Sequence, residues 1–293
     1  MTTQQNSFST SAMLVSLNIR CYSARKEDKK ISREVAENHA TTQDAGRYNK
    51  QLVSKAALDM CTKTAGALRQ YHYENTLPWL DDGVRVLPAA NLLEYKRQMT
   101  VLSDQYDAAA RDFISQWPQI VEDARIRLNG MFNIADYPTD IASRFGVAVR
   151  YMPIPDSGDF RVAVSDLERE TLRSEIESSL SEASRNAMRD IWQRLSVSVG
   201  TMAAKLAAYK RDESTGKTEN PFRDSLVENL RDLVGLIPRL NFTNDPALEK
   251  IRLEIESCLL AESADTLRES PDVRADVAQQ AQSIADRINE FMA

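Results

Sequence analysis

One long stretch of the sequence, from Asp156 to Asn220, contains no proline, and most of it has the periodicity of an α-helix. Apolar or small residues recur there at steps of three and four, which places them on one helix face. This apolar stripe comprises Leu172, Ile176, Leu180, Ala183, Ala187, Ile191, Leu195, Val199, Met202, Leu206 and Tyr209. A helix over 166–211 is roughly 65 to 70 Å long. A compact globule of this chain length is only about 50 Å across, so the pattern predicts a helix that protrudes or forms a spine.

The composition indicates a helix-rich chain that buries a core in one or two domains, because 42% of its 293 residues are hydrophobic and 27% are charged. Its three cysteines are far apart and have neither zinc nor disulfide spacing. They favour a reducing compartment, and we expect a cytoplasmic location. The apolar run 13–19 is too short for a signal peptide or a membrane span. Residues 1–12 are predicted to be a disordered tail.

Charge is unevenly distributed along the chain, whose net charge is −6. Residues 20–33 carry six basic and two acidic side chains, whereas residues 245–293 carry eleven acidic and five basic ones. This uneven charge can attract nucleic acid or an acidic partner to the basic N-terminal region, or align subunits head to tail. The alternative interpretation is two ordinary solvated helix faces.

The N-terminal half alternates between strand-like and helix-like patterns. Residues 13–22 alternate apolar and polar side chains, which is typical of a half-buried strand. Helices are predicted over 26–40 and 48–73. Turn residues at 81–83 predict a small hairpin.

A heptad pattern follows, without interruption over three repeats. Its members are Leu92, Tyr95, Met99, Leu102, Tyr106, Ala109 and Phe113. Such a coiled-coil-like seam predicts a helix lying along a partner, and the 48–73 helix is expected to be that partner in an antiparallel hairpin. Pro118 is expected to kink or restart the helix, which continues through Leu128 to Asn129-Gly130.

A short helix over 138–145 is predicted to lead into two more alternating runs, 147–151 and 160–164. These runs predict a hairpin that joins the 13–22 strand in a small antiparallel sheet. Its polar face would carry Arg20, Arg150 and Arg161, which suits phosphate or a carboxylate-rich partner. An ordinary solvated sheet face is the alternative.

Three further helices are predicted over 221–236, 246–262 and 271–292, each beginning at proline. With the long helix they can form a C-terminal bundle. The predicted fold is therefore mainly α, in the α+β class, with an N-terminal α+β domain over 13–164 and a helical domain over 165–293.

No residue constellation identifies a reaction. The nine glycines lie at least twelve residues apart, which excludes a glycine-rich phosphate loop, and 215–218 lacks the upstream glycine and strand of such a loop. The histidines, His39 and His72, lack the spacing of a metal site or a catalytic triad. We therefore expect no catalytic, cofactor-binding or metal-binding residues and predict a non-enzyme, although carboxylates distant in the sequence could still meet in space.

The order of these segments resembles a family of uncharacterised proteins in phages and integrating mobile elements. The resemblance covers roughly residues 13–210 and depends on Leu77-Pro78-Trp79, Gly83 to Pro88 and Phe145-Gly146-Val147. Members of that family are commonly encoded near MoxR-type AAA+ ATPases, von Willebrand factor A proteins resembling a cobaltochelatase subunit, and recombination genes. The resemblance implies a partner protein in phage DNA metabolism or host takeover, and it implies no catalytic residues.

Two functions follow as hypotheses. The first is a non-enzymatic scaffold that self-assembles or binds a protein partner, such as an AAA+ ATPase or a host protein, and redirects a host system. Its expected assembly face comprises Ile191, Leu195, Val199, Met202 and Leu206. The second is an accessory nucleic-acid-binding factor in phage recombination or replication. The basic patch expected to serve either function comprises Arg20, Arg25, Lys26, Lys29, Lys30, Arg33, Arg150 and Arg161.

Overall fold

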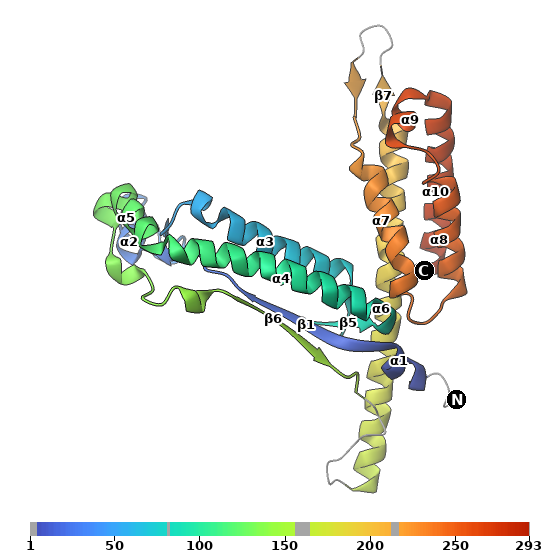
Figure 1. The fold of residues 1–293 in the computed structure, drawn as a ribbon, viewed down its shortest axis with the longest axis horizontal. Coiled ribbons are helices and arrows are strands. Elements are labelled where there is room, and N and C mark those ends of the chain that lie inside the picture. Colours follow the sequence, from blue (N-terminus) through green and yellow to red (C-terminus); the bar gives the residue numbers. More distant parts are fainter. Residues whose placement is uncertain (1–4, 81–82, 156–164, 212–216, 293) are drawn as a thin grey trace. The chain divides into compact units, whose positions relative to one another are not determined.

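The structure, a computed structural model, describes residues 5–80, 83–155, 165–211 and 217–292. It is mainly α-helical with a small antiparallel sheet, as the sequence predicts (Figure 1). The chain divides into two compact units, and neither is continuous in sequence. Unit 1 comprises Met1–Ser16, Tyr73–Tyr95 and Arg150–Ala293, and unit 2 comprises Leu17–His72 and Lys96–Val149. Several elements begin in one unit and end in the other, and the domain boundary at 164/165 stays a prediction.

Unit 2 is built around a helical hairpin, with short strands, helices and 3-10 turns. Its elements, some of which continue into unit 1, are β1 (Ala12–Arg20), β2 (Arg25–Glu27), α2 (Lys29–Asn38), β3 (Asn49–Gln51), α3 (Lys55–Glu74), α4 (Leu92–Ser115), α5 (Trp117–Leu128), η2 (Asn129–Met131), η3 (Ile134–Asp136), η4 (Ala142–Arg144) and β6 (Gly146–Met152). The helix predicted over 138–145 is only the single 3-10 turn η4. A segment this short gains too few hydrogen bonds to offset the cost of nucleating an α-helix.

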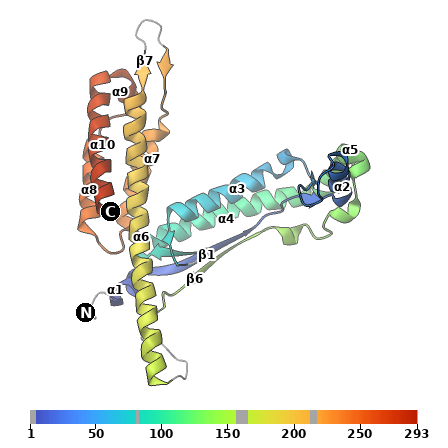
Figure 2. The ribbon, with the colours of Figure 1, turned by 180° about the vertical axis from the view of Figure 1, so that it is seen from behind.

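The predicted hairpin of helices is present, with α3 beside α4 (Figures 1 and 2). The thiol of Cys61 on α3 donates to the carbonyl of Ala109 on α4, with 3.4 Å between sulfur and oxygen. The heptad residues Met99, Tyr106 and Phe113 are buried. Apolar residues at heptad spacing therefore form the seam on which unit 2 packs.

The four-stranded sheet has the order β4-β5-β1-β6, where β4 spans Leu77–Pro78 and β5 spans Val84–Pro88. Strand β1 pairs antiparallel with β5, from Ala12 opposite Pro88 to Ser16 opposite Val84. The strand predicted over 13–22 is present as β1, although it ends at Arg20. Strand β4 pairs antiparallel with β5, as the predicted hairpin requires, while turn residues 81 and 82 lie outside the described residues. The second strand predicted after β6, over 160–164, lies outside the described residues.

Unit 1 contains the long helix α6 (Asp166–Ala208), whose 43 residues correspond to about 65 Å. A capping box starts it, in which Ser165 accepts from the Glu168 amide and the Glu168 carboxylate accepts from the Ser165 amide. The other helices of this unit are α1 (Gln5–Ser11), α7 (Ser225–Leu240), α8 (Pro246–Cys258), α9 (Ala264–Glu269) and α10 (Pro271–Met292). A short antiparallel ladder pairs β7 (Lys210–Arg211) with β8 (Thr218–Glu219).

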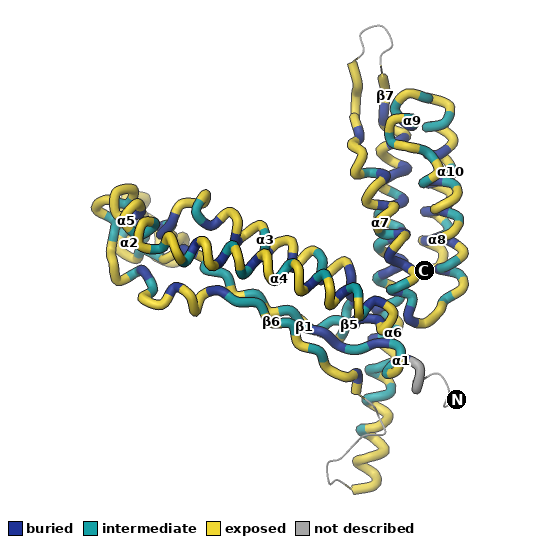
Figure 3. The backbone as a smooth tube through the Cα atoms, viewed as in Figure 1, coloured by how far each residue is buried: buried dark blue, intermediate teal, exposed yellow. Residues whose placement is uncertain are grey.

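The five residues predicted as an assembly face are buried inside unit 1 and are not available to a second chain. Each is at most 2% exposed. Helix α10 packs along this part of α6, with the Trp192 and Phe291 rings stacked at 5.2 Å and the Ser196 hydroxyl donating to Asn289 (Figures 1 and 3). Periodicity identified the apolar face correctly, but its partner is the C-terminal helix of the same chain.

The disordered tail predicted over 1–12 is corrected for residues 5–12, whereas residues 1–4 lie outside the described residues. Residues Gln5–Ser11 form helix α1, and Phe8 is buried. Its ring stacks on Phe242 at 5.0 Å and lies 6.1 Å from the ring of Trp79. A single aromatic side chain therefore anchors a segment whose other residues are mostly polar.

Candidate anion-binding cavity

A cavity of about 620 Å³ lies in unit 2, all of whose residues the structure describes. Its wall comes from the end of β1, the segment into β2, the residue after β3, and the 3-10 turns η3 and η4. The lining residues are Ile19, Arg20, Cys21, Tyr22, Ser23, Arg25, Lys26, Leu52, Ala135, Asp136, Tyr137, Pro138, Ser143 and Arg144. Segments more than 80 residues apart in sequence therefore share one wall.

A tight reversal between β1 and β2 brings the basic residues of the N-terminal segment to this wall. Ala24 has a positive φ of 51° and is fully buried. Its carbonyl accepts from the amide of Leu52 at 2.7 Å, which holds the reversal against the end of β3. Strand β2 then pairs with β3, so that Lys26 lies opposite Lys50.

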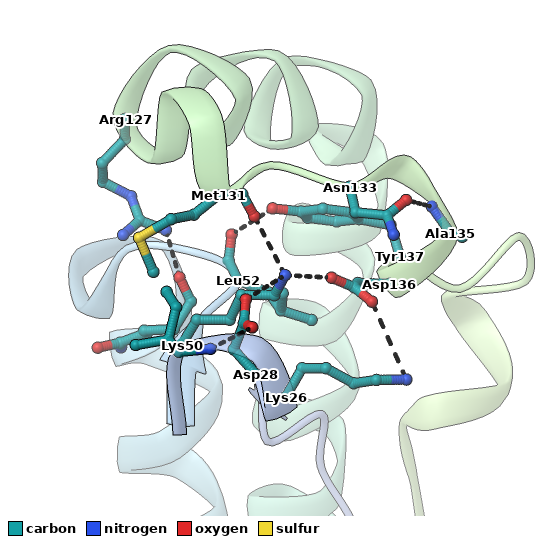
Figure 4. A network of polar contacts seen from close by, with 12 residues as sticks. Lys26, Asp28, Lys50, Leu52, Arg127, Met131, Asn133, Ala135, Asp136 and Tyr137 are labelled. Carbon is teal, nitrogen blue, oxygen red and sulfur yellow. Dashed lines mark hydrogen bonds and ion pairs between the residues drawn. The ribbon is translucent and has the colours of Figure 1, made fainter. Parts of the chain in front are cut away.

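Lys50 is the centre of a buried polar network (Figure 4). Its side chain is only 7% exposed, and its Nζ lies 2.6 Å from Asp136 Oδ2 and 3.4 Å from Asp28 Oδ2. The ammonium also donates to the carbonyl of Met131 at 3.1 Å. Lys26 lies 4.0 Å from the other oxygen of Asp136. Three segments distant in sequence are thus joined at one ammonium group.

The pKa shifts in this network follow from these contacts. Burial alone would lower the pKa of Lys50, but the hydrogen bonds and charges of Asp136 and Asp28 outweigh burial and raise it. The amide of Ile31, which Asp28 caps at the start of α2, lowers the pKa of Asp28, and Lys50 lowers it further. Two carboxylates and two lysines meet in this network, so their formal charges cancel.

Three cavity arginines remain after this cancellation. Arg20, Arg25 and Arg144 form no ion pair within the described residues, whereas the only acidic residue of the cavity wall, Asp136, is already bound to Lys50. The guanidinium of Arg20 occupies space that a larger residue at Gly146 would fill, since a Cβ there would lie 2.7 Å from Arg20 Nη2. The electrostatic balance of the wall is therefore positive, with room for an anion.

Aromatic side chains form part of the same wall. The hydroxyl of Tyr137 donates to the carbonyl of Leu52 at 2.9 Å, and its ring lies 5.2 Å from the ring of Phe132. The ring of Tyr22 meets Trp117 edge-on at 5.7 Å. Its hydroxyl oxygen is buried and has no hydrogen-bond partner in the described part of the chain.

The Tyr22 hydroxyl is held in its neutral form. Burial, followed by the nearby Tyr137, raises its pKa to about 12, and Asp136 adds to the rise while Arg144 opposes it. A buried hydroxyl without a partner costs about 1–3 kcal/mol. The cavity wall thus contains both unpaired positive charge and an unsatisfied polar group.

The structure brings together only part of the predicted basic patch. Arg20, Arg25 and Lys26 line the cavity, whereas Lys29, Lys30 and Arg33 are exposed on α2 and do not. Arg150 is exposed and belongs to unit 1, and Arg161 lies outside the described residues. Lys30 is paired with Glu34 at 3.9 Å.

Sequence reasoning missed Arg144 and the two tyrosines of the wall. Nothing near Arg144 in the sequence marks it, because its neighbours in space are residues 19–26. Tyr22 is the last residue of the strand predicted over 13–22 and is the one residue that the strand pattern could have indicated.

The arrangement suits binding rather than proton transfer. The one carboxylate of the wall is held by Lys50, and neither histidine lines the cavity. Within the described ranges, no group of three or more His, Cys, Asp or Glu side chains could hold a metal ion. The helices described here also include none with the length and hydropathy that a membrane crossing requires.

Comparison with protein-family models, with curated proteins and with solved structures finds no match to this chain.

Proposed function

We propose that this protein is a non-enzymatic accessory factor that binds nucleic acid through unit 2. The observation that carries this proposal is the set of three arginines, Arg20, Arg25 and Arg144, that surround one cavity without an ionic partner in unit 2. Guanidinium groups present several N–H donors in a plane, and this geometry matches phosphate oxygens. Phosphate contacts supply most of the affinity of sequence-independent nucleic-acid binding.

The distribution of charge between the units supports the same conclusion. Unit 2 contains 17 basic and 13 acidic residues, for a net charge of +4, whereas unit 1 contains 20 basic and 30 acidic residues, for a net charge of −10. The acidic net charge of the whole chain therefore belongs to unit 1. Electrostatic attraction of a polyanion depends on the local field, so unit 2 can attract nucleic acid although the chain is acidic.

The resemblance to a family of phages and mobile elements would place this activity in phage recombination or replication. Neighbouring recombination genes in that family agree with a nucleic-acid ligand. A bacterial cytoplasm would then be the site of action.

A salt-titrated binding assay with labelled single-stranded DNA tests the proposal. The test variant reverses two exposed cavity charges, Arg25→Glu with Arg144→Glu. Its matched control reverses two exposed charges elsewhere in unit 2, Arg69→Glu with Arg111→Glu. We expect the test variant to bind more weakly and to lower the slope of log affinity against log salt by about 0.7 per lost phosphate contact. Equal effects of the two variants, or no binding by the intact protein near physiological salt, would overturn the proposal.

The second candidate is a protein–protein scaffold, which the opposite net charges of the two units favour. A unit of +4 in one copy can attract a unit of −10 in another, so copies can associate head to tail. A partner such as an AAA+ ATPase or a host protein could bind the same surfaces. Light scattering at low and high salt tests self-association: a mass that falls from oligomer to monomer with added salt supports it, and a monomer at both salts removes it.

A further inference from the structure

The cavity has the dimensions of a site for one nucleotide rather than for a duplex backbone. Its volume of about 620 Å³ lies inside the range of roughly 300–1,000 Å³ typical of small-molecule pockets. The phosphates of a duplex lie on a convex surface, and such a surface meets grooves and exposed cations rather than filling a cavity. A nucleotide that is unpaired, terminal or free can enter one.

The charge of the wall points to a particular form of phosphate. An internal phosphodiester carries a single negative charge, whereas a phosphomonoester carries about −1.5 to −2 at pH 7. Three arginines without ionic partners are more than a single diester needs, and they match a monoester well.

The remaining wall suits the base and the sugar. Leu52, Tyr22 and Tyr137 provide apolar and aromatic surface on the same cavity as the arginines. Base–aromatic contacts tolerate any base because each base has a π-face. Tyr22 also carries a neutral hydroxyl, which is buried and has no partner in the described part of the chain.

From this combination we infer that the cavity binds the phosphomonoester of a nucleotide, either a free mononucleotide or the 5′-phosphorylated end of a single strand. The inference depends on the proposed function in one respect only, namely that the strand end is its nucleic-acid source. Arg20, Arg25 and Arg144 hold the phosphate, and the tyrosine side of the wall holds the nucleoside.

The experiment compares three probes by fluorescence anisotropy and calorimetry on the full chain: a 5′-phosphorylated single-stranded oligonucleotide, the same oligonucleotide with a 5′-hydroxyl, and a free nucleoside 5′-monophosphate. The test variant is Arg144→Gln and the matched control is Arg69→Gln. Both residues are exposed, so neither substitution disturbs the packing of unit 2. Loss of one charge-assisted hydrogen bond weakens binding by about tenfold or more.

We expect the 5′-phosphate to improve affinity by about tenfold or more, Arg144→Gln to abolish that advantage, and the monophosphate to compete. Binding of the monophosphate without binding of either oligonucleotide also supports the cavity assignment, but removes the proposed function. Equal binding of the two oligonucleotides without competition overturns the inference and leaves nucleic-acid binding intact. No binding of any probe overturns both.

Discussion

Replacement of Lys50 by methionine tests whether the buried ammonium holds unit 2 together. Methionine retains an unbranched side chain of similar length, so the substitution removes the charge with little change in volume. What remains are two carboxylates, Asp136 and Asp28, whose side chains are only 10% and 17% exposed.

The expected cost follows from these contacts. Breaking a buried ion pair by removing one partner costs about 3–5 kcal/mol, because the other charge stays buried without compensation. Two carboxylates lose their partner here, at 2.6 Å and 3.4 Å, but Lys26 remains 4.0 Å from Asp136. We therefore expect a loss at the lower end, about 3 kcal/mol in the free energy of unfolding.

Urea unfolding followed by tryptophan fluorescence measures this loss in unit 2. Trp117 belongs to unit 2, whereas Trp79 and Trp192 belong to unit 1. In a background with both unit 1 tryptophans changed to phenylalanine, the emission reports Trp117 alone. The midpoint should fall with the slope m unchanged.

Two further variants identify the cause. Lys63→Met removes an exposed lysine paired with Asp59 at 2.7 Å on the same helix, and should cost well under about 1 kcal/mol. Combining Lys50→Met with Asp28→Asn and Asp136→Asn leaves no buried charge unpaired and should recover at least half of the loss. A cost below about 1 kcal/mol for Lys50→Met, or no recovery in the triple variant, would refute the reasoning.

Four other outcomes are expected. Acidification should destabilise unit 2, because the lowered pKa of Asp28 gives stability that is present above its ordinary pKa and is lost as pH falls through the folded-state value. The raised pKa of Lys50 gives stability that is present below its ordinary pKa and is lost as pH rises to strongly alkaline values. Urea midpoints measured across pH should show both losses shrinking in Lys50→Met. Arg194 donates to the carbonyls of Tyr73, Glu74 and Thr76 at 2.7–3.0 Å, so Arg194→Ala should lower the free energy of unfolding by about 2–4 kcal/mol. Arg194→Lys, which lacks the planar guanidinium, should recover less than half of that loss, and a thermal melt showing wild-type stability for the lysine variant would contradict this. Phe8→Ala should cost about 3 kcal/mol and expose α1 to limited proteolysis, whereas an unchanged digestion pattern would show that α1 does not need this anchor. Tyr22→Phe should stabilise the protein by about 1 kcal/mol in calorimetry, and an unchanged or lower stability would show that the hydroxyl already has a partner.

Much of the fold could be predicted because its signals are local. Strict alternation over 13–22, the heptads over 92–113 and the stripe over 172–209 each define one face of one element, and β1, α4 and α6 follow them. Helix α1 could not be predicted in this way, since its stability comes from the contact of Phe8 with Phe242, more than 230 residues later in the chain. Periodicity likewise shows that a face of α6 is apolar, but not that α10 covers it.

The candidate site was predictable only in its N-terminal part. Arg20, Arg25 and Lys26 lie close together in the sequence and are visible as a basic cluster. Arg144 and Tyr137 reach the same cavity through tertiary structure alone. The sequence also gives no sign of the ion pairs that Lys26 and Lys50 form with Asp28 and Asp136. The excess of arginine over carboxylate on the cavity wall therefore becomes apparent only in the structure.

The ammonium of Lys50 also constrains how unit 2 can fold. Its partners at Met131 and Asp136 are 81 and 86 residues further along the chain, so the contact closes a loop that contains the entire α3–α4 hairpin. Closing a loop of this length costs entropy that the local helical contacts must first offset. During synthesis the segment 19–26 has no opposite wall until residues 135–144 have left the ribosome. The cavity can therefore form only after both of its walls have been synthesised.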